Sequence, residues 1–231
     1  MNNLIIVRHG QSLWNKERRF TGWADIDLTE QGKSEAEQAG KLIKKLKIEF
    51  HAYFTSQLKR SINTLEIILE VLDKKNVEII KTTALNERHY GGLTSLNKDE
   101  TIKKYGHEQV QIWRRSYNIS PPQMDSQHPY KNKINSDILS ESLEDTFKRV
   151  MPYYNENIKP LISSKKNILI VFHGNSCRAL LKKIFNISDE KIVELEIPTG
   201  NPFLIRFGDN LKIEDYKYLD VQRRRKIFFN V

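Results

Sequence analysis

Hydrophobic residues along this chain form two kinds of pattern: short continuous runs, and longer stretches in which they recur at helical spacing. The runs at 4–7 and 168–172 consist of branched and aromatic residues, which is typical of buried strands. Strands are predicted over residues 4–7, 52–55, 77–80, 168–172, 203–207 and 211–218.

The longer stretches place an apolar residue at every third or fourth position, as in a helix with one buried face. One stretch follows Thr29 and reaches Leu46, and another follows Ser56 and reaches Leu72. Thr29 and Ser56 are therefore potential N-caps. Further helices are predicted over 143–158 and 176–185.

The alternation of strands and helices predicts an α/β fold with three layers, αβα, in which a mostly parallel sheet is flanked by helices on both faces. A length of 231 residues suits one domain spanning 1–231. The segment 86–142 interrupts the alternation with polar, aromatic and proline-rich sequence. We expect it to be an insertion over one edge of the sheet that covers the functional site, because sites in such sheets form beyond the carboxyl ends of the strands.

Composition and charge narrow the classes of function. The chain carries 38 Lys and Arg residues against 29 Asp and Glu, and this net charge of +9 favours anionic partners such as nucleic acid, acidic lipid or a phosphorylated or carboxylated metabolite. No secretion signal or long apolar stretch is present, so a cytoplasmic protein without a membrane partner is expected. The single cysteine, Cys177, can form no internal disulfide and is expected to be buried and inert. No Cys or His spacing predicts a metal site.

Two predicted strands end in the same way, with a histidine and a glycine just past the strand. The segments 5–10 and 170–175 read Ile-Ile-Val-Arg-His-Gly and Ile-Val-Phe-His-Gly-Asn. Glycine allows a ligand to approach the backbone, neutral imidazole can attack phosphorus, and Arg8 can neutralise phosphoryl oxygens. Either motif alone would be an ordinary coincidence. The pair, at matching places in the topology, predicts a phosphoryl-binding pocket.

A family resemblance extends over nearly the whole chain. The matching blocks are 4–15, 19–23, 55–60, 85–91, 96–98, 112–115, 121–122, 173–176 and 197–200. Through these blocks the chain resembles the 2,3-bisphosphoglycerate-dependent phosphoglycerate mutases of the histidine phosphatase superfamily. The resemblance implies an isomerase of glycolysis and gluconeogenesis that interconverts 3-phosphoglycerate and 2-phosphoglycerate through a phosphohistidine. It also implies priming by 2,3-bisphosphoglycerate, no metal, and a homodimer as the common assembly.

The resemblance implies that His9 becomes phosphorylated, with Arg8, Arg60 and His173 around the transferring phosphoryl group. The chemistry agrees, because a histidine that donates one ring nitrogen to the backbone keeps the other as a nucleophile. Glu87 is the implied partner in proton exchange with the substrate hydroxyl, since a hydroxyl that attacks phosphohistidine needs a base. The alternative for Glu87 is a surface carboxylate paired with the neighbouring arginine.

The substrate-binding residues implied by the resemblance are a mixture of cations and small donors. They are Ser12, Asn15, Thr21, Gly22, Arg88, Tyr90, Lys98, Arg114, Arg115, Gly174 and Asn175. Arg114 and Arg115 would point about 100° apart on a helix, so one of them could instead serve solvent or a salt bridge. Gly174 and Asn175 would supply donors at a helix N-terminus, which is a natural anion site.

Two other functions remain open at this stage. One is a bisphosphoglycerate synthase or phosphatase, or a broader phosphomonoesterase, on the same fold. A plain phosphatase needs no clamp for a glycerate carboxylate, so Lys98 and Arg114 argue against it. The other is a noncatalytic protein that binds anions or nucleic acid, a hypothesis that the presence of His9 and Glu87 makes poor. We therefore expect a small phosphoglycerate substrate and no nucleic-acid partner.

The sequence departs from the family pattern in three places. Gln11 stands where relatives usually carry glutamate, and the stretch 126–139 is shortened. The end of the chain is brief and basic, and its run 223–226 is expected to be a solvated face.

Overall fold

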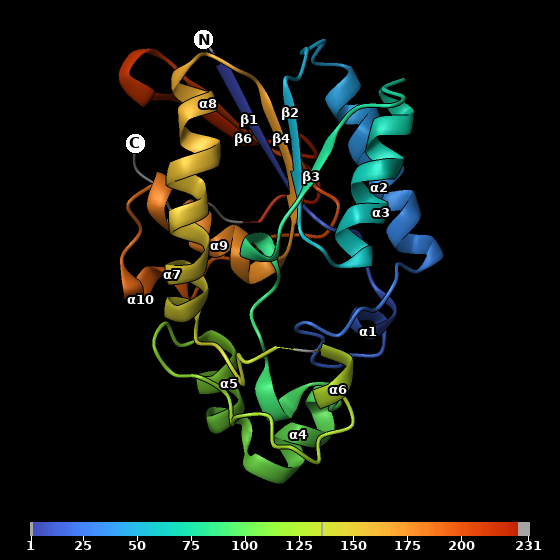
Figure 1. Ribbon diagram of the computed structural model, residues 1–231, viewed down its shortest axis with the longest axis vertical. Helices are drawn as coiled ribbons and strands as arrows, with labels where there is room; N and C mark the ends of the chain where they lie inside the picture. The colour runs from blue at the N-terminus through green and yellow to red at the C-terminus, as the bar shows by residue number, and fades with distance from the viewer. Residues whose placement is uncertain (1, 135, 226–231) are drawn as a thin grey trace.

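The computed structural model describes residues 2–134 and 136–225, and within them a six-stranded sheet forms the centre of the molecule (Figure 1). The strands lie in the order β3-β2-β4-β1-β5-β6. Pairings β3–β2, β2–β4 and β4–β1 are parallel, whereas β1–β5 and β5–β6 are antiparallel. The predicted mostly parallel α/β sheet is confirmed. The strands are β1 (Asn2–Arg8), β2 (Ala52–Thr55), β3 (Ile79–Lys81), β4 (Ile168–Phe172), β5 (Phe203–Phe207) and β6 (Ile213–Tyr218).

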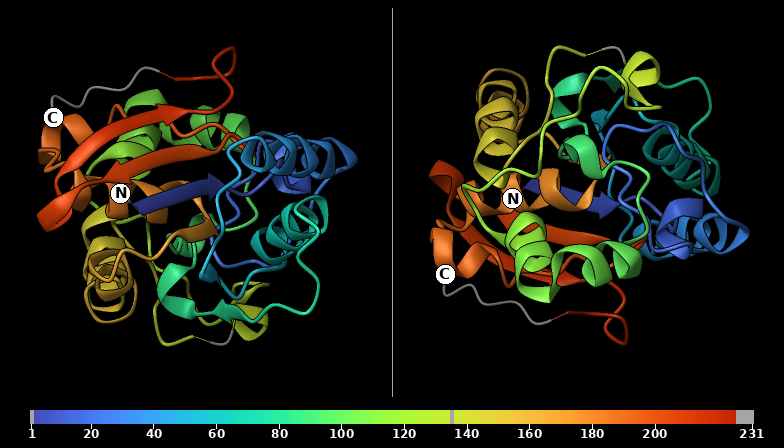
Figure 2. Two further views of the ribbon diagram at one scale, coloured as in Figure 1. Left: turned by 90° about the horizontal axis from the view of Figure 1, so that it is seen from above. Right: turned by 90° about the horizontal axis from the view of Figure 1, so that it is seen from below.

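Helices cover both faces of the sheet, as the two views in Figure 2 show. On one face lie α2 (Glu30–Lys44) and α3 (Lys59–Val71), which pack against each other. On the other lie α7 (Leu143–Tyr153), α8 (Lys159–Ser163) and α9 (Gly174–Ile184), and a π-helical turn at Tyr154–Ile158 joins α7 to α8. The shorter helices are α1 (Leu13–Lys16), α4 (Lys98–Tyr105), α5 (His107–Arg115), α6 (Lys131–Ile134) and α10 (Asp189–Ile192). Single 3₁₀ turns occur at Thr83–Leu85, Gly91–Leu93 and Asp209–Leu211.

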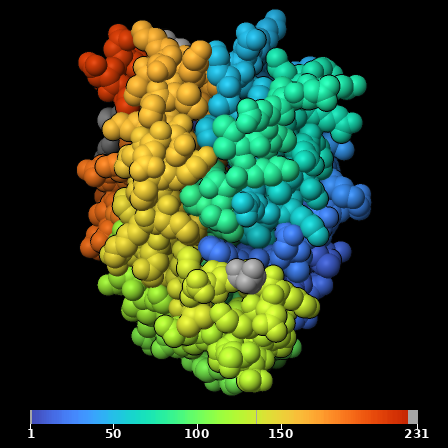
Figure 3. All heavy atoms as spheres, in the orientation of Figure 1, coloured from blue at the N-terminus to red at the C-terminus, as the bar shows by residue number. Residues whose placement is uncertain are grey.

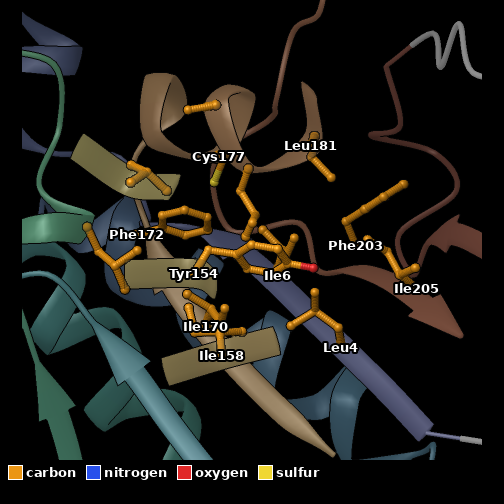
Figure 4. Packing of buried hydrophobic residues seen from close by; sticks show 14 of the residues in the cluster. Leu4, Ile6, Tyr154, Ile158, Ile170, Phe172, Cys177, Leu181, Phe203 and Ile205 are labelled. Atoms are coloured by element: carbon orange, nitrogen blue, oxygen red, sulfur yellow. The ribbon is translucent and has the colours of Figure 1, made fainter. Parts of the chain in front are cut away.

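The side-chain alternation of β1 divides the core into two hydrophobic layers, because successive residues of a strand point to opposite faces. Leu4 and Ile6 pack with α7, α8 and α9, and Figure 4 shows Ile6 close to Ile170 of the neighbouring strand, its partner in the register. Ile5 and Val7 pack into the other layer, with α2 and α3. The sheet is thus fixed from both sides, which holds the carboxyl ends of β1 and β4 in one place.

The segment 86–142 lies beyond the carboxyl ends of the central strands, where it contributes α4, α5 and α6 (Figure 1). The expected position over one edge of the sheet is therefore wrong, although the expectation that it covers the site stays a prediction. In Figure 3 this segment, green to yellow-green, forms the lower part of the molecule. The connection between β1 and α2, residues 9–29, is called the β1 loop. It is joined to this segment by backbone hydrogen bonds between Phe20 and the residues Ser95 and Leu96.

Several predicted boundaries are corrected by the structure. Thr29 caps α2 through its side chain, as predicted, but α2 ends at Lys44, before Leu46. Ser56 does not cap α3, whose N-cap is Leu58 with no side-chain hydrogen bond. β3 covers Ile79–Lys81 instead of 77–80, because its burial is only partial and the apolar pattern at an edge strand is weak.

Candidate active site

A cavity of about 620 Å³ opens beyond the carboxyl ends of β1 and β4. It brings together predicted residues that lie far apart in the sequence. Those that line it are Arg8, His9, Asn15, Thr21, Gly22, Arg60, Glu87, Tyr90, Lys98, Arg114, Arg115, Gly174 and Asn175. Ser12, Arg88 and His173 were predicted with them but do not line the cavity.

His9 follows directly after β1, and its ring is fixed by its own loop. Nδ1 lies 2.6 Å from the carbonyl oxygen of Gly10, which can only accept, so Nδ1 carries the proton and Nε2 keeps its lone pair. Burial, with the nearby charges of Arg60 and Arg8, holds the pKa of His9 well below its usual value. His9 is therefore a neutral imidazole with a lone pair on Nε2, and the predicted donation of one ring nitrogen to the backbone is confirmed.

The loop that carries His9 is held against α2 by a close backbone approach. A Cβ on Gly10 would lie 2.2 Å from the carbonyl oxygen of Gly32, so only glycine fits there. Gln11 belongs to the same junction: its backbone N–H donates to Glu35 Oε2 at 2.9 Å, and its side-chain oxygen accepts from Thr29 at 3.0 Å. Gln11 thus supports the loop and does not line the cavity.

His173 is fully buried beside His9. The two ring centroids are 5.0 Å apart in an edge-to-face arrangement. Burial, together with Arg60, lowers the pKa of His173 well below its usual value. Nε2 lies 2.7 Å from Ser56 Oγ, and the other ring nitrogen, Nδ1, is buried at the start of α9, where the capping box pairs the His173 side chain with the backbone N–H of Ser176.

Two arginines supply fixed positive charge. Arg60, in the first turn of α3, is anchored by donation to the carbonyl oxygens of Gly22 at 2.7 Å and Ala24 at 2.9 Å. Burial lowers its pKa to about 10, so it stays charged at neutral pH. Arg8 donates to Ile197 at 2.8 Å, while its Nε is buried without a partner within the described chain. A buried unpaired donor beside a cavity is the group that a bound anion would satisfy.

Glu87 is held at the start of α9 by backbone donors. Its Oε1 accepts from the N–H of Asn175 at 3.0 Å and from the N–H of Arg88 at 2.9 Å. Glu87 is buried, so the alternative of a surface carboxylate is wrong. Its carboxylate lies against Gly174, where an added Cβ would come 3.7 Å from Oε2.

The part of the cavity formed by the segment 86–142 carries an excess of positive charge. Burial lowers the pKa of Lys98 to about 8, and Arg114 adds to this effect. Burial acts to raise the pKa of Tyr90, but Arg88 and Lys98 outweigh it and lower that pKa to about 8. Cationic side chains that lie this close together repel one another, and binding of an anionic ligand would relieve the repulsion.

Arg115 and Arg114 both line the cavity but differ in their partners. Arg115 forms a salt bridge with Glu196, with Nη2 and Oε1 2.8 Å apart. The side chain of Arg114 has no such ion pair among the described residues. Of the two, Arg114 is therefore the better placed to bind a ligand.

Ser12 and Arg88 do not line the cavity but contact residues that do. Ser12 is fully buried and caps α1 by accepting from the N–H of Asn15. Arg88 is fully buried, stacks over the ring of Tyr90 at 4.6 Å, and donates to the carbonyl oxygen of Arg114 at 3.1 Å. Its described contacts are thus with Tyr90 and α5, while its buried Nε and Nη1 have no partner among the described residues.

The cavity also contains residues that sequence reasoning missed. Arg178, one turn into α9, donates to Asn175 Oδ1 at 3.2 Å and to the carbonyl oxygen of Leu195 at 2.8 Å. Its spacing of three residues from Asn175 was the available signal. Arg223, Arg224 and Arg225 also line the cavity, which the sequence did not predict; Arg224 and Arg225 are exposed, as expected of a solvated face, and Arg223 is partly buried. Lys226 lies outside the described residues.

The basic segment is tied to the rest of the molecule through Arg223. Its guanidinium donates to Asp220 at 2.9 Å and to the carbonyl oxygen of Gly200 at 3.1 Å. Gly200 in turn donates its N–H to the carbonyl oxygen of Arg8. The segment is therefore joined to the strand end that positions His9.

Cys177 is buried, as expected, and burial raises its pKa well above the usual value, which disfavours the reactive thiolate. Across 2–134 and 136–225, no group of His, Cys, Asp and Glu side chains could hold a metal ion. In the same ranges, no helix is long and apolar enough to cross a membrane.

Comparisons with known proteins agree with this geometry. Residues 4–213 match the model of the histidine phosphatase superfamily, branch 1. The chain is 45% identical to a 2,3-bisphosphoglycerate-dependent phosphoglycerate mutase of Porphyromonas gingivalis, over 98% of this chain and 96% of that protein. It is 46% identical to a protein of the same name from Treponema denticola, over 96% and 93% of the two chains.

Solved structures show the same fold at lower identity. A mycobacterial glucosyl-3-phosphoglycerate phosphatase superposes with a TM-score of 0.73 at 19% identity, over 94% of this chain and 97% of that one. Bacillus stearothermophilus YhfR superposes with a TM-score of 0.70 at 21% identity, over 93% and 95%.

Proposed function

Because this chain belongs to branch 1 of the histidine phosphatase superfamily, with mutase relatives 44–46% identical to it, we infer that it is a 2,3-bisphosphoglycerate-dependent phosphoglycerate mutase. The enzyme interconverts 3-phosphoglycerate and 2-phosphoglycerate. The observation that carries this conclusion is the identity of about 45%, which extends over nearly the full length of both proteins. This interconversion is a step of glycolysis.

We propose that His9 is the residue that takes and returns the phosphoryl group, through Nε2. Bound 2,3-bisphosphoglycerate would supply the phosphoryl group that primes His9. The residues fit such a polyanion, since the buried Nε of Arg8 and the buried Oγ1 of Thr21 have no partner in the part of the chain described. Phospho-His9 then donates to the free hydroxyl of a monophosphoglycerate, and His9 takes back the other phosphoryl group. A single nucleophile thus serves both directions.

Arg8 and Arg60 are suited to stabilise the phosphoryl group during transfer. Charge spreads over its equatorial oxygens, and fixed cations in a site with little water stabilise that charge without rearranging. Arg60 is anchored to two carbonyl oxygens and so needs no reorganisation. We propose that Glu87 accepts the proton of the attacking hydroxyl and returns it to the leaving oxygen.

Lys98, Tyr90 and Arg114 would hold the end of the glycerate that is not reacting. They line the same cavity as His9 but come from the segment 86–142, so one ligand can contact both groups. A glycerate carries its carboxylate and phosphate at opposite ends, which matches two separate clusters of cations. These three residues, the substrate clamp, would keep the bisphosphate intermediate bound while it reorients.

Replacing Arg114 by alanine should lower mutase kcat/KM by about 10- to 150-fold, because a charge-assisted hydrogen bond contributes about 1.5–3 kcal/mol. Hydrolysis of a small generic phosphate ester should change little, since such an ester offers Arg114 nothing to hold. Steady-state kinetics with both substrates measures the two effects. Lys103→Ala, an exposed cation on the neighbouring helix α4, is the matched control. An equal loss of both activities would place Arg114 in the phosphoryl pocket.

The pH dependence of kcat/KM should show an alkaline limb near pH 8. The pKa values of Lys98 and Tyr90 are both lowered to about 8, so above that pH Lys98 loses its positive charge and Tyr90 gains a negative one. Both changes weaken binding of an anionic substrate, and kcat/KM reports the groups of the free enzyme. Because Tyr90 still titrates near pH 8, Lys98→Arg should make the limb less steep, and the double variant Lys98→Arg/Tyr90→Phe should move it to higher pH. A limb that keeps its steepness in Lys98→Arg would remove Lys98 from the titration.

Chelation should leave activity intact, and vanadate should inhibit. The nucleophile in this account is an imidazole, and two arginines supply the charge stabilisation that a metal would otherwise give. Vanadate can form a five-coordinate species that mimics the transferring phosphoryl group. Loss of turnover in EDTA with recovery on added manganese would contradict the mechanism.

The mutase conclusion itself is tested by following 3-phosphoglycerate with ³¹P NMR in the presence of catalytic 2,3-bisphosphoglycerate. A mutase produces 2-phosphoglycerate with little inorganic phosphate. Accumulation of inorganic phosphate as the main product would indicate a phosphatase instead.

We also propose that the enzyme acts in the cytoplasm and forms a homodimer, as the family resemblance implies. Light scattering coupled to size-exclusion chromatography tests the assembly: twice the chain mass supports the dimer, and 27.2 kDa contradicts it.

A further inference from the structure

Three side chains form a closed line of hydrogen bonds behind the phosphoryl pocket. Ser56 Oγ lies 2.7 Å from His173 Nε2 and 2.5 Å from Ser61 Oγ. Ser61 Oγ donates to the carbonyl oxygen of Leu58 at 2.9 Å. All three side chains are fully buried, so no solvent competes for these bonds.

The direction of this line follows from counting protons. A carbonyl oxygen can only accept, so the single hydroxyl proton of Ser61 points to Leu58. The short contact between the two serine oxygens then needs the proton of Ser56, because two oxygens at 2.5 Å without a proton between them would repel. Ser56 therefore has no proton left for His173 and must accept from it. Nε2 of His173 carries the proton.

We propose that Ser56 and Ser61 are positioning residues that set the tautomer of His173, with the proton on Nε2 and the lone pair on Nδ1. The inference rests on the proposed phosphoryl transfer at His9 and adds two residues to that site. Neither serine lines the cavity, so both act through His173.

The tautomer decides which nitrogen can respond to a bound phosphoryl group. His173 stands edge-on to His9, and its buried Nδ1 is paired with the backbone N–H of Ser176 in the capping box of α9, which requires a lone pair on Nδ1. Because Nε2 is already occupied by Ser56, a proton attracted by the negative charge of a bound phosphoryl group can be added only at Nδ1. The same ring could not do this in the other tautomer, in which Nδ1 would already hold the proton and Nε2 would face Ser56 as an acceptor.

The test is ¹⁵N NMR of histidine-labelled full-length enzyme without any substrate, with His173→Gln used to assign the signal. In the wild-type enzyme we expect Nε2 of His173 to show a protonated shift and Nδ1 an unprotonated one. The reverse assignment, or an even mixture of tautomers, overturns the proposal. This readout does not depend on activity.

Two variants then distinguish the contribution of Ser56 from that of Ser61. In Ser61→Ala, the proton of Ser56 loses its acceptor and becomes free to donate to Nε2, so the tautomer should shift toward protonated Nδ1. In Ser56→Ala, Nε2 loses its partner and both tautomers should appear. Each variant should lower kcat by about 3- to 30-fold with little change in KM, because the substrate clamp is untouched. Ser142→Ala, which removes a buried serine that caps α7, is the matched control and should keep both the tautomer and kcat.

The outcomes distinguish this inference from the proposed function. Unchanged tautomer signals in both folded serine variants overturn the inference, even if the enzyme is a mutase. If Ser56→Ala does not fold, the wild-type spectrum and Ser61→Ala still decide. The expected tautomer in a protein that converts no phosphoglycerate would leave the serine line supported and the mutase conclusion contradicted.

Discussion

Replacing His9 by alanine will remove the phosphoryl label from the enzyme and lower mutase activity by about 10⁴-fold or more, as expected when a covalent nucleophile is deleted. The wild-type enzyme incubated with 2,3-bisphosphoglycerate should carry one phosphoryl group, on His9. The bond should be labile in acid and stable in alkali, because a phosphoramidate hydrolyses when its nitrogen is protonated. Phosphopeptide mass spectrometry under alkaline conditions locates the label.

The physical basis is the state of the His9 ring. Nδ1 is committed to the carbonyl oxygen of Gly10, and burial with Arg60 and Arg8 keeps the ring neutral, so Nε2 is available to attack. His107→Ala is a suitable control, because His107 is an exposed residue at the start of α5. It should keep the label and the activity. A label that persists in His9→Ala would exclude His9 as the acceptor.

Replacing Glu87 by glutamine should lower kcat by about 10²- to 10⁴-fold, the usual contribution of a general acid and base. Glutamine keeps an oxygen that can accept from the N–H groups of Asn175 and Arg88, so the start of α9 should stay in place. The proton exchange is lost and the geometry remains. Both phosphorylation of His9 and transfer to the substrate should slow, because one step needs the acid and the other the base.

Rapid-quench measurement of phosphoenzyme formation and decay separates these two steps. Glu37→Gln, an exposed carboxylate on α2, provides the control and should behave as wild type. If Glu87→Gln retains activity within a few-fold of the wild type, another group exchanges the proton, and the role given to Glu87 must be withdrawn.

Much of the fold follows from local pattern. β1, β2 and β4 appear as apolar runs because both faces of a central strand are covered, and every residue in them is then buried or nearly so. β3 is harder to place, since it pairs with β2 alone and is only partly buried. The position of 86–142 could not be read from its composition, because its location depends on contacts with the β1 loop.

The candidate site shows the same limit. His9 and its backbone partner are neighbours in sequence, so their arrangement could be anticipated. Ser56 and His173 are 117 positions apart, and a serine just before a helix has the pattern of an N-cap. Its actual partner is visible only in three dimensions.

The blocks that match the family also do not show which residues line the cavity and which contact the lining residues from outside it. Ser12 and Arg88 lie within matching blocks, yet one caps α1 and the other backs Tyr90. The sequence also does not indicate that the exposed basic segment 223–225 lines the cavity, because nothing local shows that the segment returns to it. Contacts of this kind depend on the path of the whole chain.

The most direct test of the central claim is a coupled assay of 3-phosphoglycerate conversion, run with and without added 2,3-bisphosphoglycerate. The enzyme is first dephosphorylated, so that His9 carries no phosphoryl group at the start. The account predicts little conversion without the bisphosphate and strong activation at catalytic concentrations of it, because His9 must be phosphorylated before the cycle can begin. Conversion at the same rate in its absence, or release of inorganic phosphate in place of 2-phosphoglycerate, would contradict a mutase primed through His9.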